Sequence, residues 1–207
     1  MEATLHRGRA VQSVTDLPPT EQALAAKDPT LGQVISAQSA RWPSLPTEDV
    51  IWGLVRIVMA QQVSTLVACK LAERAKTEHP HLLKPSPRNV PDAKSFRALG
   101  LSQRRAQCCS EILIRSAEIR SRIQIGQTWE QTLSGIKGIG PWTIAVFSIM
   151  VLREPDVLPL KDVGLERAIA NVYGWPQDVE KLGEKWRPFR SVACWYLWRT
   201  LGNEQLG

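Results

Sequence analysis

The sequence has few cysteines, no long apolar run and almost no sign of β-strands. Its four cysteines are Cys69, Cys108, Cys109 and Cys194. They form neither a C-x-x-C pair nor a tight cluster, which excludes a zinc ribbon and a four-cysteine iron–sulfur loop, so we expect reduced core thiols. No stretch is long and uncharged enough to span a bilayer, and the N-terminal residues lack the apolar run of a signal peptide. We therefore expect a soluble cytoplasmic protein that is not exported.

Positive charge and tryptophan are what the chain does contain. Its formal net charge is +6 and its pI is about 9.4, which favours an acidic partner such as nucleic acid. Eight tryptophans are many for 207 residues, and most of them must lie in a core or a cleft because large rings are costly to expose. A chain of this length can bury a core without disulfides, as one large domain or two small lobes.

Helical periodicity recurs along the whole chain, so the sequence predicts an all-α fold. Thr47 is expected to cap a helix through Gln62, and Ser64 and Ser102 to cap the next long helices. The predicted helices cover residues 20–40 in two pieces divided at Asp28-Pro29, then 48–62, 65–78, 92–99, 103–122, 128–133, 141–152 and 163–173, with two more after Pro176 and Pro188.

The helix expected over residues 103–122 is the most basic element of the chain. Its arginines are Arg104, Arg105, Arg115, Arg120 and Arg122. They form either a solvated face or a set of direct phosphate contacts, and the sequence favours neither reading.

The stretch "SGIKGIGPW" is too short for anything except a tight turn between two helices. Gly138 and Gly140 permit positive φ, and Pro141 suits the first helical position. Backbone N–H groups at such a helix start have no intrahelical acceptor and suit a phosphate. A purely structural turn explains the same residues.

Asp162 directly precedes the helix expected over residues 163–173. Aspartate is a common N-cap there, and a helix N-terminus favours a negative charge. Capping and catalysis are compatible roles, and the local sequence alone does not separate them.

The pattern L-x-G-I-x-G-I-G-x-W-T-x-A followed by an acid resembles the helix-hairpin-helix DNA glycosylase superfamily, above all its 3-methyladenine DNA glycosylase II branch. The resemblance runs from about Pro46 to Gly202, through "VRIVMAQQVS", "LGLSQRRAQ", "LPLKDVGLERA" and "KWRPFRSVACWYLW". It implies two helical lobes around a cleft in one compact body, without the α/β N-terminal lobe of longer bacterial enzymes. Residues 1–45 would join the C-terminal lobe, and residues 46–207 would form the glycosylase region with its hairpin at 133–142.

The resemblance implies a monofunctional glycosylase of base excision repair. Such enzymes flip an alkylated base out of duplex DNA and hydrolyse its N-glycosidic bond, which leaves an abasic site. Asp162 would be the catalytic carboxylate, stabilising positive charge on the deoxyribose. Trp142 stands where strand-cutting relatives carry a Schiff-base lysine. The cysteine pattern leaves no place for the iron–sulfur cluster of another branch.

The remaining site residues are also implied by the resemblance. Trp142 and Trp198 would surround the flipped base, whereas Trp52, Trp129, Trp186 and Trp195 are expected in the core. Val146 replaces an aromatic of a bacterial relative, which predicts a more open pocket and leaves the substrate range undecided. The DNA-binding set is Lys137, Gly138, Ile139, Gly140 and Thr143 of the hairpin, with Gln62 filling the gap left by the flipped base. Main-chain carbonyls of Ser134, Ile136 and Ile139 would bind a structural Na+ or K+; no other cofactor is expected.

Two alternatives stay open. One is a non-catalytic helix-hairpin-helix DNA-binding module, in which Asp162 is only a cap and the tryptophans are only core. The other is a glycosylase for a different lesion, such as uracil, hypoxanthine or an etheno adduct. In every case the expected partner is double-stranded DNA, with damaged bases for the enzyme, and not a membrane. A monomer is the expected state, associated with the bacterial nucleoid or, in a eukaryote, with the nucleus.

Overall fold

The computed structural model describes residues 13–83, 91–174 and 177–202, and every regular element in these ranges is helical, as the sequence predicted. In chain order they are η1 (Val14–Asp16), α1 (Pro19–Lys27), α2 (Pro29–Ser36), α3 (Val50–Ala60), α4 (Thr65–Glu78), η2 (Pro80–Leu83), α5 (Ala93–Ala98), α6 (Gln103–Ile114), α7 (Ser116–Gln124), α8 (Trp129–Leu133), α9 (Pro141–Phe147), the π-helical η3 (Ser148–Leu152), α10 (Val163–Tyr173), α11 (Val179–Lys185) and α12 (Arg190–Arg199). Between the helices expected over residues 65–78 and 92–99, residues 84–90 lie outside the described ranges.

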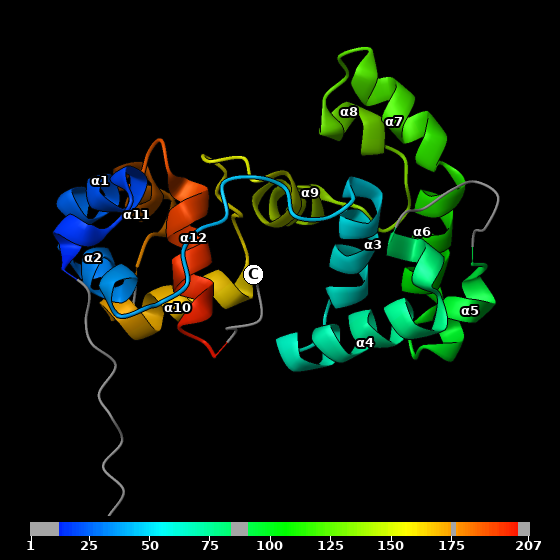
Figure 1. Ribbon diagram of the computed structural model, residues 1–207, viewed down its shortest axis with the longest axis horizontal. Coiled ribbons are helices and arrows are strands. Elements are labelled where there is room, and N and C mark those ends of the chain that lie inside the picture. Colours follow the sequence, from blue (N-terminus) through cyan, green and yellow to red (C-terminus); the bar gives the residue numbers. More distant parts are fainter. Residues whose placement is uncertain (1–12, 84–90, 175–176, 203–207) are drawn as a thin grey trace, which may run out of the picture.

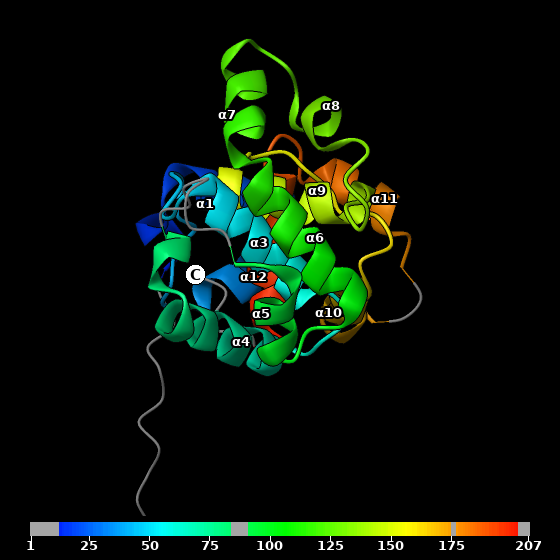
Figure 2. The ribbon, with the colours of Figure 1, turned by 90° about the vertical axis from the view of Figure 1, so that its right-hand side faces the viewer.

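The helices form two groups that are joined through α9 and η3 (Figure 1). One group contains α1, α2, α10, α11 and α12, and α2 packs against both α10 and α12. The other contains α3 to α8, with α7 and α8 side by side at one end of the molecule (Figures 1 and 2). The segment η3 contacts α3 in one group and α12 in the other. The two ends of the chain thus contribute helices to the same group.

Helix α3 differs from its prediction at both ends. Asp49, not Thr47, is the N-cap, and its Oδ1 accepts from the N–H groups of Ile51 at 2.9 Å and Trp52 at 3.2 Å. Asp49 also pairs with Arg120, so tertiary contacts favour it over the threonine. The helix ends at Ala60, because the chain turns through Gln62 at a φ of 57°.

The single helix expected over residues 103–122 is wrong, since α6 ends at Ile114 and α7 starts at Ser116. Helix α6 packs against α3 and α5, whereas α7 packs against α8, and one straight helix could not serve both neighbours. Four of the five arginines have partners within the protein. Arg105 donates to main-chain carbonyls of Met59 and Gln61, Arg115 bonds Glu111 and Glu118, Arg120 pairs with Asp49, and Arg122 pairs with Glu118. The structure therefore favours a structural role for most of this basic face.

The expected core is largely confirmed. Trp52, Trp186 and Trp195 are buried, and the half-buried Trp129 packs edge-on against Phe147 with ring centroids 4.9 Å apart. Cys108, Cys109 and Cys194 are buried free thiols. Burial raises the pKa of the Cys108 thiol to about 12, so it stays protonated near neutral pH. Cys69 is the exception to the prediction, because it is half-buried on the wall of a cleft.

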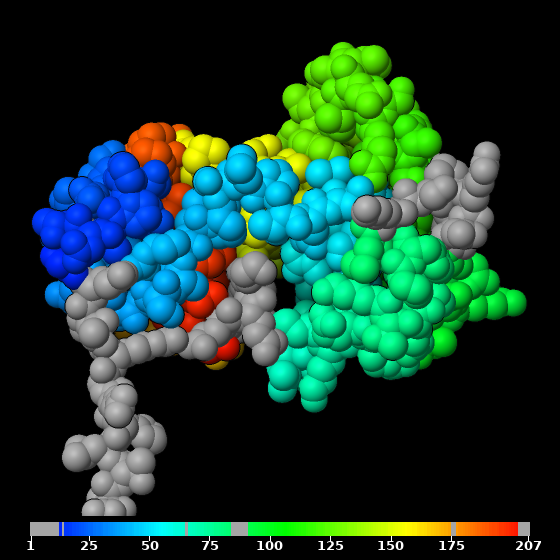
Figure 3. Space-filling view, in the orientation of Figure 1, coloured from blue at the N-terminus to red at the C-terminus, as the bar shows by residue number. Residues whose placement is uncertain are grey.

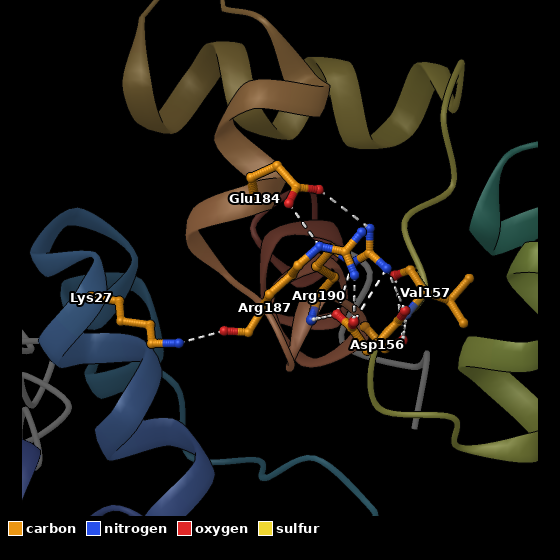
Figure 4. Close-up of polar contacts among 7 residues, drawn as sticks. Lys27, Asp156, Val157, Glu184, Arg187 and Arg190 are labelled. Carbon is orange, nitrogen blue, oxygen red and sulfur yellow. Dashed lines mark hydrogen bonds and ion pairs between the residues drawn. The ribbon is translucent and has the colours of Figure 1, made fainter.

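A polar cluster fixes the segment between η3 and α10 to the last helices (Figure 4). Asp156 accepts from Arg190 Nε at 2.7 Å and from Arg187 Nη1 at 3.0 Å. The hydroxyl of Ser191 accepts from the N–H of Val157 at 2.9 Å. Burial by itself raises the pKa of Asp156, but the hydrogen bonds and charges of the two arginines outweigh it and hold this pKa below its ordinary value.

Candidate active site

A cleft of about 1030 Å³ lies between the two groups of helices. Its walls come from α3, the turn after it and α4 on one side, and from α9, η3, the start of α10 and α12 on the other. Figure 3 shows the surface hollowed between α4 and the group that carries α12. Asp162, Trp142, Trp198, Val146 and Gln62 all line this cleft, so the structure brings together five residues chosen from separate stretches of sequence.

Asp162 is the N-cap of α10, as predicted, and only 7% of its surface is exposed. Its Oδ1 accepts from the N–H of Leu165 at 2.5 Å and from the indole N–H of Trp198 at 2.9 Å. Its Oδ2 accepts from the indole N–H of Trp142 at 2.6 Å. Three donors from three helices therefore hold one carboxylate.

This set of donors defines what the carboxylate can do chemically. A buried carboxylate is costly unless it is hydrogen-bonded, and bonds to the charged form are shorter and stronger than neutral ones. The helix N-terminus adds partial positive charge beside the carboxylate. Asp162 is consequently a fixed negative charge facing the cleft, suited to stabilising a cation that develops there.

Gly164 provides the space for this arrangement. A Cβ built on Gly164 would lie 3.1 Å from Asp162 Oδ1 and 3.6 Å from both Cδ1 and Nε1 of Trp198. The first distance is tighter than usual, so a larger residue would push the carboxylate by a few tenths of an ångström, whereas the distances to the ring are ordinary contacts. The sequence alone gave no reason to select this glycine.

The two tryptophans are not equivalent. Trp142 is half-buried, and with its N–H on Asp162 it still presents ring surface to the cleft. Trp198 is 6% exposed, so most of its ring is covered by the protein. Trp142 is the better placed of the two to stack on a base, and the main contact of Trp198 is with the carboxylate.

Asp28 shows that capping a helix and accepting an indole N–H do not by themselves make an aspartate part of the site. It caps α2, is 6% exposed, and its Oδ2 accepts from the indole N–H of Trp186 at 3.0 Å and the hydroxyl of Tyr173 at 2.8 Å. Asp28 lies in the core between α2, α10 and α11, whereas Asp162 lies on the wall of the cleft. The location, and not the hydrogen-bonding pattern, separates the two.

The hairpin has the expected tight turn, with one correction. Gly138 has a φ of 105°, and a Cβ built there would lie 3.2 Å from Cys108. Gly140 has a φ of −123° and needs no glycine for its backbone, so the expectation of positive φ there is wrong. The second positive φ belongs to Gly135, at 87°. Ile136 is buried beneath the turn and Lys137 is exposed above it.

Thr143 divides its roles between side chain and backbone. Its buried hydroxyl accepts from Gln61 Nε2 at 2.9 Å, and the same amide donates to the carbonyl of Gly138 at 3.0 Å. Gln61, which no feature of the sequence distinguishes from Gln62, thus attaches the hairpin to the end of α3. The backbone N–H groups of Gly140, Trp142 and Thr143 have no acceptor within the described residues. A phosphate would find these three donors at the start of α9.

The hairpin carbonyls fit a monovalent cation in part. Within the described ranges no N–H donates to the carbonyls of Ser134 and Ile139, whereas the carbonyl of Ile136 accepts from the N–H of Ile139 at 3.2 Å. A carbonyl oxygen has two lone pairs, so Ile136 also keeps a free position. These oxygens match the hard ligands that Na+ or K+ takes, and the ion stays a prediction.

The whole arrangement is that of a helix-hairpin-helix DNA glycosylase. The sequence matches no protein-family model. DNA-3-methyladenine glycosylase 1 of Schizosaccharomyces pombe is 29% identical over 171 residues, which cover 76% of this chain and 75% of that protein. The chain belongs to the 3-methyladenine DNA glycosylase family of the helix-hairpin-helix superfamily.

Two solved structures have the same fold. The 3-methyladenine DNA glycosylase of S. pombe in complex with abasic DNA matches with a TM-score of 0.74 at 24% identity, over 89% of this chain and 97% of that one. The DNA-3-methyladenine glycosidase of Bacillus halodurans matches with a TM-score of 0.66 at 29% identity, over 91% of each chain. In the part of this chain that the structure describes, no helix is long and apolar enough to cross a membrane.

Proposed function

We propose that this protein is a monofunctional DNA glycosylase that flips alkylated bases out of duplex DNA and hydrolyses their N-glycosidic bond. The observation that carries the proposal is Asp162, a buried carboxylate held by two indole N–H groups on the wall of the interlobe cleft. A non-catalytic binding module has no need for a fixed negative charge there. Known relatives with the same fold are named as 3-methyladenine DNA glycosylases.

The reaction follows from the charge that develops as the bond breaks. Departure of the base leaves positive charge on the deoxyribose, and a fixed anion beside C1′ stabilises that state more than bulk water does. Both oxygens of Asp162 already accept hydrogen bonds. The carboxylate therefore acts mainly through its charge, and a water molecule from the cleft completes the hydrolysis.

Strand cleavage by a Schiff base is not part of the proposed reaction. Trp142 occupies the position at which strand-cutting relatives carry the nucleophilic lysine. The product is an intact strand with an abasic site.

Base selection is assigned to the side of the cleft formed by Trp142 and Val146. An indole face attracts a cationic base such as 3-methyladenine or 7-methylguanine through a cation–π interaction of about 1 kcal/mol. Val146 is 9% exposed and small, which leaves room for bulkier lesions than an aromatic would.

DNA docks across the hairpin and the turn after α3. The free N–H groups of Gly140, Trp142 and Thr143 and the exposed Lys137 receive phosphate oxygens, which are sequence-independent contacts. Gln62 is exposed on the rim of the cleft and fills the space of the flipped base. A cation on the carbonyls of Ser134, Ile136 and Ile139 would add positive charge beneath the same phosphates. The protein acts as a monomer.

The experiment that tests the function is a glycosylase assay on methylated duplex DNA. We expect release of 3-methyladenine and 7-methylguanine, with strands that break only after heating in alkali. Binding of duplex DNA without release of any base from methylated, deaminated or etheno-modified substrates would favour the binding module. Release of hypoxanthine or etheno-adenine alone would retain the enzyme and change its substrate.

A further inference from the structure

Lys161 stands next to Asp162 on the wall of the cleft, and nothing in the sequence pattern pointed to it. Its φ is 64°, a left-handed backbone conformation that residues other than glycine and asparagine rarely adopt. The turn that imposes it is closed by a hydrogen bond from the N–H of Asp162 to the carbonyl of Pro159 at 3.2 Å. Strained residues of this kind concentrate at functional sites, where the side chain is needed despite the strain.

The other charged side chains of the cleft are satisfied within the protein. Arg56 pairs with Glu48 at 2.5 Å and Lys76 pairs with Glu73 at 2.8 Å. Asp162 is occupied by its three N–H donors. Lys161 is exposed, and within the described ranges it makes no ion pair and no hydrogen bond through its amine. It is the one unpaired cation among the described residues that line the cleft.

We propose that Lys161 binds the phosphate beside the flipped nucleotide, and so recognises the extrahelical state and not duplex DNA in general. The proposal rests on the proposed function, because it takes the sugar of the flipped nucleotide to lie against Asp162. The residues on either side of Asp162 then face the sugar–phosphate backbone of the DNA strand that enters the cleft. Val163 on one side is apolar and 68% exposed, and Lys161 on the other supplies the charge.

The arrangement of Asp162 explains why Lys161 stays available. A lysine beside a carboxylate with free oxygens can form an ion pair with it, and the ion pair would compete with binding to an external anion. Here the two indoles and the N–H of Leu165 hold both carboxylate oxygens, so Asp162 does not engage the ammonium group of Lys161, which is free to bind an external anion. In this arrangement the carboxylate of Asp162 faces the sugar, and the ammonium group of Lys161 faces the phosphate.

The test compares Lys161→Gln with Lys161→Arg and with Lys185→Gln, a charge-matched control on α11 away from the cleft. Glutamine already occupies a left-handed position in this chain at Gln62, where φ is 57°, so the variant is expected to fold. Thermal unfolding verifies that. Binding is measured on two duplexes of the same sequence, one undamaged and one with a tetrahydrofuran abasic-site analogue.

We expect Lys161→Gln to bind the abasic duplex about tenfold more weakly, and the salt dependence of that binding to lose about one phosphate contact. Affinity for the undamaged duplex should stay near that of the wild type, as should both affinities of Lys185→Gln. Lys161→Arg should bind the abasic duplex with an affinity near that of the wild type. Equal losses on both duplexes, or no loss on either, would overturn the proposal. So would a borohydride-trapped adduct that disappears in Lys161→Gln, since the amine would then react at C1′. Binding needs no catalysis, so an inactive wild type with these affinities would contradict the proposed function alone.

Discussion

Asp28 and Asp162 are two aspartates in nearly the same surroundings. A comparison of the two separates the effect of catalysis from the effect of capping. Each caps a helix, is buried, and accepts an indole N–H. Only Asp162 faces the cleft. Asp28→Asn is therefore a matched control for Asp162→Asn.

Both substitutions weaken hydrogen bonds to a buried carboxylate, so each should cost about 1–3 kcal/mol of stability, measured by urea unfolding. Only Asp162→Asn should lower the excision rate of a neutral damaged base, by about 100-fold or more, with little change in duplex affinity. The loss should be smaller for 7-methylguanine, which already carries positive charge and leaves readily. Wild-type rates in Asp162→Asn alongside the same loss of stability would make the residue a structural cap.

Trp142 and Trp198 separate base stacking from support of the carboxylate. Trp142→Phe and Trp198→Phe each keep an aromatic ring and remove one N–H from Asp162, at Oδ2 and Oδ1 respectively. Without one of its N–H donors the carboxylate is held less firmly beside the sugar, and a misplacement of about 1 Å can cost about 100-fold in rate, so single-turnover excision should slow by roughly 10- to 100-fold in both.

The buried ring of Trp198 predicts that its variant slows every substrate alike. Trp142→Ala, which also removes the ring surface that faces the cleft, should in addition slow the excision of cationic bases more than that of neutral ones. A Trp198→Phe variant with wild-type rates would show that its N–H does not support the reaction.

At the scale of single elements, the hairpin tests whether the start of α9 receives phosphate. Gly138 is a poor site for substitution, since its positive φ and its contact with Cys108 would disturb folding. Gly140 is the better choice, because its φ is −123° and a Cβ built there meets nothing within 4 Å.

Gly140→Val should therefore fold, while its side chain crowds the free N–H groups of Trp142 and Thr143. We expect weaker binding to damaged and undamaged duplexes alike, and a shallower dependence on salt. Fluorescence anisotropy on both duplexes measures it. A change in base preference at unchanged affinity would place the hairpin at the base instead of the backbone.

The sequence predicted those elements whose signals are local. Asp28-Pro29 divides α1 from α2, Ser64 caps α4, and Gly174 ends α10 at a φ of 78°, all as expected from capping and glycine rules. The break at Arg115 and the cap at Asp49 depend on partners that are distant in sequence. Propensity within one segment carries no information about such contacts.

The same division holds for the candidate site. Asp162, Trp142 and Val146 belong to motifs that resemble a known superfamily, and they meet in one cleft. Three residues of the site have no such motif. Gln61 acts through a hydrogen bond to the hairpin, Gly164 through its close approach to Asp162, and Lys161 through its left-handed backbone angle. A single sequence carries no pattern for any of these features. Most of Trp198 proved to be buried, a fact that only packing decides.

At the scale of the whole molecule, global stability should depend on the ion pairs that hold the segment before Asp162 against the start of α12 and the turn that precedes it. Arg190 and Arg187 lower the pKa of Asp156 below its unfolded value of about 4. A carboxylate with a depressed folded pKa stabilises the fold fully above the unfolded pKa, and this contribution is lost as the pH falls through the folded pKa. The Asp156 contribution is thus present at neutral pH and disappears in acid.

Asp156→Asn should accordingly lower the free energy of unfolding by about 1–3 kcal/mol at pH 7, toward the lower end because 26% of its side chain is exposed. The difference from the wild type should persist at pH 5 and shrink below about pH 4. Urea unfolding across this range measures it. Asp178→Asn, which removes an acidic N-cap with no arginine partner among the ion pairs of the described residues, controls for net charge. If the deficit of Asp156→Asn were the same at every pH, packing and not the ion pairs with Arg187 and Arg190 would anchor this segment.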